Sequence, residues 1–573
     1  MQNYHRHSVV SNIILADSVV FNEDYCKRAK ELGHGIISSC EHGTQGNIFE
    51  CYELAKKYGL KWRYVAEAYF VQDRNPELAD NANCHIILAA KTDKGRGDLN
   101  EVLSEANISG YYHRPRVDME LLMRLDPRDV FVTTACLGGI WKYGYTENRE
   151  TGEWSYDFTV PDRLVHQLHR HFGNSFMLEI QYHDVDKQKA VNRHILSLYR
   201  QLGIPLIVGL DSHFIYPEQA ELRDARLEAN GLHYENEDGF YMDYPPDDEV
   251  FRRFMVQGVF SEAQIREAME NTDIFLNFED IELDMSRKLP TLYPNLSQQE
   301  RNERYRQLVR DSWREARKEI PQERWPEYLE AIKYEVDTIT QTDMSDYFLL
   351  DYEVVKRYKE LGGRITKTGR GSGPSYYTNT LLGFSSIDRL ALPVTMYPDR
   401  FISKDRLLSG STPDLDLNLG DPELAEQATD DIMGPWHCAP MVAWGTLQRS
   451  SAWKMYCRVE KIPPAEADAV SKQLKQYELA VKYAEDEEDA EQINPYDYVP
   501  EQYHEVLQKS EKYLGMIERA TPHACAHLIT NADIRREIGI YRINSKSGKK
   551  KVVLAAFIDG ATADRFGYLK NDL

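Results

Sequence analysis

Short apolar segments alternate with amphipathic helices over the first 280 residues, and this rhythm constrains the fold more than any other feature of the chain. A helix with one apolar face is indicated around residues 191–202, and an apolar segment over 204–210 follows it. Similar segments of strand length lie at 35–39, 84–90, 130–134 and 176–180. Strands that alternate with helices form βα units around a largely parallel sheet. The sequence therefore predicts an α/β domain over residues 1–280.

Side chains of the types that bind metals follow several of these predicted strands. His42 comes after 35–39, Cys136 after 130–134, and Asp211 with His213 after 204–210. In a βα barrel the carboxyl ends of the strands face a common site, so such residues can converge. A single histidine is more often a packed or surface residue than a ligand. The set as a whole, together with His5 and His7 near the chain start, predicts a metal centre.

A second candidate site lies near the middle of the chain, where residues 411–418 read STPDLDLN. On a strand, Asp414 and Asp416 would project from one face while Leu415 and Leu417 anchor the other. Two carboxylates at this spacing can hold Mg²⁺ and leave positions for water and phosphate oxygens. The alternative is an ordinary edge strand with one face in water.

A glycine-rich turn precedes this stretch by about forty residues and reads TGRGSGP over 368–374. Gly369 and Gly371 would let backbone N–H groups approach a phosphate, and Arg370 and Ser372 would add a guanidinium fork and a hydroxyl. A basic surface turn is the alternative interpretation.

Four motifs in the order DYFL (346–349), the glycine-rich turn, Arg400-Phe401 and the carboxylate stretch resemble the palm of the bacterial C-family replicative DNA polymerases, the DNA polymerase III alpha subunits. The resemblance implies an α+β, nucleotidyltransferase-like palm that transfers a nucleotide from a dNTP to a primer 3′-hydroxyl on primer-template DNA. It implies Mg²⁺ ligands at Asp414, Asp416 and Asp572, and triphosphate binding by Gly369, Arg370, Gly371 and Ser372. The Asp572 position depends on its Lys-x-Asp frame, because Asn571 replaces the usual Phe of the family.

The N-terminal ligand residues resemble the PHP (polymerase and histidinol phosphatase) domain that opens many of these polymerases. The resemblance implies a distorted (β/α)7 barrel that holds divalent metals, Zn²⁺ or Mn²⁺ among them. The implied ligands are His5, His7, Asp17, His42, Glu67, His85, Cys136, Asp211 and His213, with His113 as a competitor for His85. The intact set implies a metal-dependent 3′→5′ exonuclease, and the alternative is that the metals only stabilise the fold.

On the same resemblance the chain divides into a PHP barrel (1–280), a first palm part (281–420), a helical thumb insertion (421–514) and a second palm part (515–573). In the thumb, Lys454 and Arg458 lie four residues apart on one helix face and would contact the backbone of a DNA duplex. Arg519, His523 and Lys570 would support the palm near its metals.

The net charge of −23 on 573 residues opposes duplex binding, which depends on Lys and Arg. Much of the acidity falls in 484–489, which reads as a solvated helix face or loop. The sequence has no apolar run of 18 residues and no signal-peptide pattern, and its eight cysteines include no CxxC pair. We therefore expect a cytoplasmic protein, bacterial or in a phage-infected host, without a membrane segment or disulfide framework.

The resemblance also sets expectations about partners. The fingers, clamp-binding region and OB-fold of the family are missing after Asp572, so we expect a second, more basic polypeptide that carries them and contacts a sliding clamp. Divergent motifs favour a phage source. Two alternatives to a polymerase are a PHP phosphoesterase with a vestigial polymerase half and a non-catalytic scaffold for replisome partners.

Overall fold

A computed structural model describes residues 1–78, 80–148, 151–232, 239–365, 371–394, 396–408, 415–417, 419–484, 486–544 and 552–572, the side chains of Glu487 and Asp572 excepted. The chain forms two compact units. The first comprises Met1–Leu283 with Trp444–Ala520, and the second Asp284–Ala443 with Thr521–Leu573. Most of the predicted thumb thus belongs to the same unit as the predicted PHP domain, whereas residues 421–443 belong to the second unit.

The first unit contains a six-stranded mixed sheet in the order β10-β9-β6-β4-β3-β5. The strands are β3 (Val65–Phe70), β4 (Cys84–Ala90), β5 (Arg116–Val117), β6 (Val130–Thr133), β9 (Phe176–Ile180) and β10 (Leu206–Val208). Neighbours β10, β9 and β6 run parallel, while β4 is antiparallel to both β6 and β3. Four of the five strands predicted in this region are in this sheet.

The fifth predicted strand is β1 (Ile36–Ser38), which pairs in parallel with β2 (Lys61–Arg63) in a separate two-stranded sheet. Isolated bridges join Arg6 to Ser212 and His42 to Glu67. Among the described residues the main sheet runs openly from β10 to β5, so the mixed α/β class is confirmed and closure into a barrel stays a prediction.

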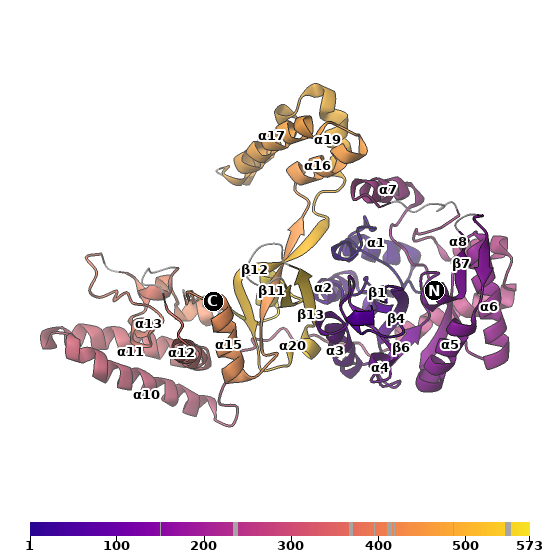
Figure 1. Ribbon diagram of the computed structural model, residues 1–573. Helices are drawn as coiled ribbons and strands as arrows, with labels where there is room; N and C mark the ends of the chain where they lie inside the picture. Colours follow the sequence, from indigo (N-terminus) through magenta and orange to yellow (C-terminus); the bar gives the residue numbers. More distant parts are fainter. Residues whose placement is uncertain are drawn as a thin grey trace. The chain divides into compact units, whose positions relative to one another are not determined.

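Helices flank these strands because each has one apolar face. They are α1 (Asn22–Leu32), α2 (Ile48–Tyr58), α3 (Asp93–Ile108), α4 (Met119–Leu122), α5 (Thr159–Phe172), α6 (Asp186–Leu202), α7 (Ala220–Ala229), α8 (Asp247–Gln257) and α9 (Glu262–Glu270), with the hairpin β7 (Tyr145–Glu147) and β8 (Trp154–Tyr156). Helix α3 packs on β4 (Figure 1). Helices α5 and α6 pack on β9, and α9 packs on β10. Helix α6 buries Val191, Ile195 and Leu198, which confirms the predicted apolar face.

The remainder of the first unit is helical, with α16 (Arg449–Val459), α17 (Pro464–Lys482), α18 (Glu487–Gln492) and α19 (His504–Glu511). Helix α16 packs against α17, α19 and α7 (Figure 1). Trp453, Leu474 and Leu507 form the core of this helical part. It is tied to α7 by a hydrogen bond of 2.9 Å from Tyr513 Oη to the carbonyl oxygen of Leu222.

The second unit is built around one buried helix, α12 (Ser345–Glu360), which packs on α10 (Gln298–Ala316) and α15 (Pro422–Met433) (Figure 1). Its other helices are α11 (Trp325–Gln341), α13 (Tyr377–Leu381), α14 (Lys404–Leu408), α20 (Ile534–Glu537) and α21 (Gly560–Arg565). Phe348, Leu350 and Val354 of α12 are almost completely buried. The DYFL motif therefore lies in the first turn of the helix at the centre of this core, rather than ahead of it.

A five-stranded sheet in the order β13-β14-β11-β12-β15 completes the second unit. Its strands are β11 (Cys438–Thr446), β12 (Ile517–Ile529), β13 (Ile540–Asn544), β14 (Val552–Ala556) and β15 (Leu569–Asp572). β15 runs antiparallel to β12, with Asp572 opposite Ala526 and Asn571 opposite His527.

Within the described ranges, every helix falls short of the length and apolar character that crossing a membrane would require.

Candidate functional site

The nine residues predicted as PHP ligands come together in the first unit. His5 and His7 flank the bridge to Ser212, Asp17 follows in the next loop, His42 comes after β1, Glu67 lies in β3, His85 begins β4, Cys136 follows β6, and Asp211 and His213 follow β10. Residues up to 208 positions apart in the chain thus share one site, as expected for side chains at the ends of βα strands.

Glu67 is the centre of this cluster, which we call the PHP cluster. Its Oε2 lies 2.9 Å from His5 Nε2 and 3.4 Å from His7 Nε2. Its Oε1 lies 2.7 Å from His42 Nδ1 and 2.9 Å from His85 Nδ1. One carboxylate that faces four imidazoles can bridge two metal ions, because each oxygen is available to a different one.

The other two carboxylates and the thiol extend the PHP cluster. Asp17 Oδ2 is 3.2 Å from His42 Nε2 and 3.3 Å from His213 Nε2.

Asp211 Oδ1 is 3.2 Å from both His5 Nε2 and His7 Nε2, and Cys136 Sγ is 3.3 Å from His85 Nδ1. Three overlapping groups have donor atoms close enough to hold a metal ion: His7 with His42 and His213; His5 with His7, Glu67 and Asp211; and His42 with Glu67 and His85. The donor set of imidazoles, carboxylates and one thiol suits Zn²⁺ or Mn²⁺.

Burial and mutual charge shape the protonation of these groups. Burial alone would raise the pKa of Glu67, but His85, His42 and His7 hold that pKa well below its usual value. Burial would likewise raise the pKa of Asp17, which His42 and His213 keep low. The carboxylates are thus ionised, as metal ligands must be.

Backbone geometry around the PHP cluster is unusual for the residue types involved. Arg6 is buried on the side opposite His5 and His7, where it donates to Asn22 Oδ1 at 2.5 Å. Asp211 and Ala135, the residue before Cys136, have φ angles of +48° and +56°. Left-handed conformations at non-glycine residues are uncommon and cluster at functional sites.

Two residues that support the PHP cluster were not predicted from the sequence. Glu179 Oε1 is 2.7 Å from His5 Nδ1, and Glu179 also accepts a hydrogen bond from Tyr4 Oη. Glu41 accepts from Ser8 and Ser11. A glutamate in the middle of the apolar strand β9 is the signal that could have revealed Glu179, since such residues are seldom fully buried without a partner.

The structure separates the two histidines that competed for one ligand position. His85 lies within the PHP cluster, beside Glu67 and Cys136. His113 is exposed, has a φ angle of +58° and its ring contacts Tyr112. The geometry favours His85.

In the second unit, the glycine-rich turn meets the carboxylate stretch. Gly371 has a φ angle of +64°, and a Cβ atom at this position would overlap Oδ2 of Asp416. Ser372 follows in the same turn, and Gly373 packs against Leu415. Asp414, Gly369 and Arg370 lie outside the described residues, and for Asp572 only the backbone, in β15, is described.

The carboxylate stretch shows the predicted alternation but not the predicted strand. Leu415 and Leu417 are buried, and Asp416 between them is half-buried. Residues 415–417 are outside any sheet of the described chain, and an isolated bridge from Leu419 to Ile365 follows them. The expectation of a strand here is wrong for 415–417, because side chains of α12 rather than a neighbouring strand satisfy part of the backbone.

Helix α12 supplies this support from one stripe of its surface. Tyr347, Asp351, Val354 and Tyr358 share a face because they recur at helical spacing. Tyr347 Oη accepts from Leu415 N–H at 3.1 Å, and Tyr358 Oη accepts from Asp421 N–H at 3.0 Å. Asp351 Oδ1 accepts from Asn571 Nδ2 at 2.6 Å. The stripe therefore contacts both the carboxylate stretch and β15.

The three predicted palm-support residues make separate contacts in the structure. His523 Nδ1 accepts from the N–H of Ala526, the residue opposite Asp572. Lys570 Nζ pairs with Asp564 at 2.8 Å. Arg519 belongs to the first unit, where its side chain packs against Gly445.

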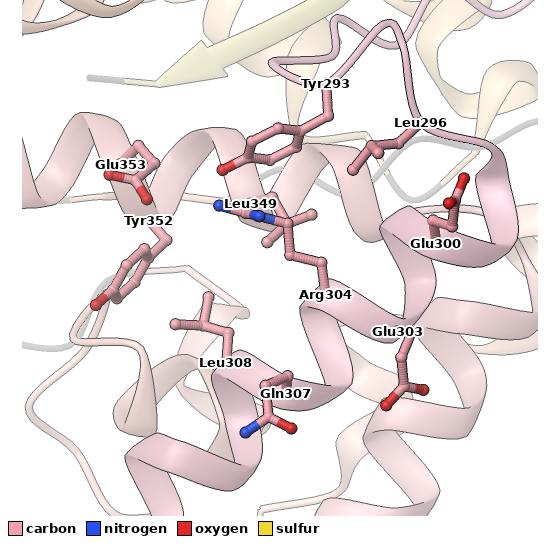
Figure 2. A pocket seen from close by; sticks show the side chains of 10 residues that line it. All are labelled: Tyr293, Leu296, Glu300, Glu303, Arg304, Gln307, Leu308, Leu349, Tyr352 and Glu353. Atoms are coloured by element: carbon pink, nitrogen blue, oxygen red, sulfur yellow. The ribbon is translucent and has the colours of Figure 1, made fainter.

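The opposite face of α12 borders an open cavity of about 550 Å³, shown in Figure 2. Leu349, Tyr352 and Glu353 line it from α12, and the Arg304 guanidinium lies 4.1 Å from the centre of the Tyr293 ring. Of the predicted catalytic and phosphate-binding residues whose side chains the structure describes, Gly371, Ser372 and Asp416 are absent from its lining. α12 thus presents one face to this cavity and the other to the predicted site.

Two known protein families match separate parts of the chain. Residues 3–183 match the PHP domain, and residues 306–573 match the family described as bacterial DNA polymerase III alpha NTPase domain. The chain is thus similar to a PHP domain in its first part and to a polymerase III alpha domain in its second part. It is a relative of the bacterial DNA polymerase III alpha subunits, which confirms the resemblance predicted from its motifs.

Individual relatives extend over most of the chain. The DNA polymerase III subunit alpha of Aquifex aeolicus is 24% identical over 620 residues, which cover 99% of this chain and 50% of the relative. The subunit alpha of Helicobacter pylori strain J99 is 25% identical and covers 78% of this chain and 38% of its own length. The subunit alpha of Borreliella burgdorferi is 24% identical, and the match covers 94% of this chain and 46% of the relative. The chain therefore spans about half the length of these relatives or less.

Proposed function

We propose that the chain provides the PHP and palm parts of a DNA-directed DNA polymerase that extends a primer on a template with dNTPs. The family resemblance supports this role, and one observation in the structure carries it. Gly371 of the predicted triphosphate turn packs directly on Asp416 of the predicted metal-binding stretch. A phosphate held by the turn would therefore lie beside the carboxylate that holds its metal.

Each residue of the palm has a role in this proposal. Asp414, Asp416 and Asp572 would hold Mg²⁺, which when bound lowers the pKa of the primer 3′-hydroxyl and stabilises charge at the α-phosphate. Arg370 and Ser372 would orient the β and γ phosphates through charge-assisted hydrogen bonds. Gly371 has no side chain, so its N–H can approach a phosphate oxygen closely.

The helical part of the first unit offers a surface for the duplex. Lys454 and Arg458 are exposed on one face of α16, as their spacing predicted. Lys454 Nζ pairs with Asp468 at 2.6 Å, so DNA would have to compete with that carboxylate. Contacts to the phosphate backbone position a duplex without reading its sequence, which suits a replicative enzyme.

Primer extension by the purified chain with Mg²⁺ and dNTPs tests this proposal. Gly371→Ala should lower the rate by about 10²-fold, because the added methyl group displaces Asp416. Gly362→Ala is the matched control, since Gly362 also has a positive φ, +93°, but has open space around its Cβ position. Equal rates for the two variants would remove Gly371 from the site. Because the fingers are expected on a second polypeptide, extension is measured with and without added candidate partners, and its absence under both conditions would count against the polymerase.

A second activity is favoured by the PHP cluster. We propose that it binds Zn²⁺ or Mn²⁺ and supports 3′→5′ exonuclease cleavage, in which the metal activates a water for attack on the phosphodiester. All nine predicted ligands are close together, and the carboxylates among them are held ionised. A stabilising role alone is the alternative, and it predicts bound metal without cleavage.

Metal analysis and an exonuclease assay on His7→Ala and Asp211→Ala separate these readings. Both variants should lose bound metal and cleavage while keeping primer extension. His113→Ala, an exposed histidine of the same domain, is the control and should keep all three. If the wild-type chain shows cleavage but no extension, the PHP phosphoesterase with a vestigial palm is favoured. If it shows neither cleavage nor extension, the non-catalytic scaffold is favoured.

A further inference from the structure

We propose that Asp351 is a protonated carboxylic acid that pairs with Asn571 through two hydrogen bonds, and that this pair positions β15, the strand of Asp572, for the metal site of the palm. The second part of the proposal rests on the proposed polymerase function. The first part is a statement about two buried side chains and can be tested without any activity.

The geometry of the two side chains calls for one additional proton. Asn571 Nδ2 donates to Asp351 Oδ1 at 2.6 Å, and both side chains are buried, at 0% and 1% exposure. The remaining oxygens, Asp351 Oδ2 and Asn571 Oδ1, are buried and have no hydrogen-bond partner among the described residues. Both of these oxygens are acceptors while Asp351 is ionised, and a proton on Asp351 Oδ2 converts that oxygen into a donor for Asn571 Oδ1.

The surroundings of Asp351 favour the neutral acid. An ionised carboxylate buried without a cation or several N–H donors is strongly disfavoured. Burial raises the pKa of Asp351 to about 8, opposed only by the hydrogen bond from Asn571. Among the described residues of the elements packed on α12, no charged or titratable side chain contributes to this pKa. The acid is therefore neutral at pH 7.

The pair connects two parts of the predicted palm site, the carboxylate stretch and β15. Asp351 shares its stripe of α12 with Tyr347, which binds the backbone of Leu415 beside Asp416. Asn571 is the neighbour of Asp572 in β15. One helix face thus fixes both the carboxylate stretch and the strand of the third predicted ligand. Asp351 and Asn571 do not touch the reacting atoms in this proposal, so they are positioning residues.

Two substitutions at Asp351 distinguish a neutral pair from a charged one. Asp351→Asn keeps one donor and one acceptor, so it can form both hydrogen bonds with Asn571 and should extend primers within about twofold of wild type. Asp351→Leu keeps the approximate volume but neither bond. It should lower kcat by about 10- to 100-fold, the cost of losing an outer partner of a metal site, and raise the Mg²⁺ concentration required.

A double-mutant cycle isolates the pair from general damage to the core. Asp351→Leu, Asn571→Leu and the double variant are compared by chemical unfolding and by extension. The double variant should be no worse than either single variant, because it leaves no buried polar group unpaired. Additive losses would mean that the two side chains act separately and would overturn the pairing.

Infrared difference spectroscopy tests the proton directly. At pH 7 the wild-type spectrum minus the Asp351→Asn spectrum should contain the carbonyl band of a protonated carboxylic acid. The Asp351→Leu spectrum minus the Asp351→Asn spectrum should lack this band. A carboxylate band in its place would overturn the proposal. If the acid band is present but the wild-type chain shows no extension, the polymerase function fails and the acid–amide pair stands. If extension is robust and unaffected by Asp351→Leu, the positioning role fails alone.

Discussion

The PHP cluster and the palm site are assembled in opposite ways. In the PHP cluster the functional side chains contact one another, with Glu67 touching four histidines and Asp17 and Asp211 touching two each. In the predicted palm site, the described contacts are made by helix α12. Its stripe binds the backbone at Leu415 and the side chain of Asn571. The first site is held by its own ligands and the second by a scaffold.

The two sites should therefore respond differently to mutation. A cluster whose members neutralise one another loses binding when any member changes, because a buried charge is left without its partner. A scaffolded site can lose its chemistry while the fold survives, because a half-buried carboxylate such as Asp416 contributes little to the core.

The largest effect is expected for Asp416→Asn in the palm. Loss of one metal ligand should lower primer extension by on the order of 10³-fold, about 4 kcal/mol of transition-state stabilisation. The free energy of unfolding and the metal content of the PHP cluster should equal those of wild type. Steady-state extension, chemical unfolding and metal analysis check the three expectations. Retained extension would remove Asp416 from the site.

Glu67→Gln should have a large effect on the PHP cluster. The neutral amide cannot compensate four imidazoles or bridge metals, so metal affinity should fall by more than the roughly 100-fold that an outer partner can cost. Metal titration of the variant and of Glu77→Gln, an exposed glutamate of the same unit, makes the comparison. Wild-type affinity in Glu67→Gln would break the description of Glu67 as the centre of the cluster.

Glu179→Gln should show an intermediate effect, because Glu179 acts through His5. The amide can still accept from the His5 ring, but without a negative charge it no longer makes His5 a more basic ligand, so metal affinity should fall by about 10- to 100-fold. Metal titration of Glu179→Gln tests this expectation. Asn571→Leu in the second unit is the control and should leave PHP metal binding unchanged. An affinity as low as that of Glu67→Gln would mean that Glu179 is itself a ligand.

The last expected effect is a pH dependence of stability that comes from Asp351. Between about pH 4 and pH 8 the carboxyl is ionised in the unfolded chain and protonated in the folded one, whose pKa is about 8. The folded state then binds more protons, so the unfolding free energy falls as pH rises, by about 1.4 kcal/mol per pH unit from this group. Asp351→Asn lacks this dependence. Urea unfolding of both proteins from pH 5 to pH 8 measures the difference, and parallel pH profiles would contradict it.

Much of the first unit followed from the sequence alone. Periodicity located strands β1, β4, β6, β9 and β10 and helix α6, because buried parallel strands and one-sided helices leave apolar patterns in the chain. The motif resemblance named the nine residues that the structure brings together in the PHP cluster, and their role as metal ligands stays a prediction. Residue type and position after a strand singled out His42, Cys136, Asp211 and His213, because the ends of neighbouring strands meet, and the family resemblance supplied the rest of the set.

Tertiary structure decided what local pattern cannot encode. Only packing shows that His85 rather than His113 faces Glu67, that Glu179 stands behind His5, and that residues 415–417 are held by a helix instead of a sheet. The sequence marked Asn571 as a departure from its motif, and the structure supplied its partner, Asp351, 220 residues away. The residue types determine which chemistry is available, whereas contacts between distant segments determine which atoms share a proton, because burial and distance set the energy of each charge.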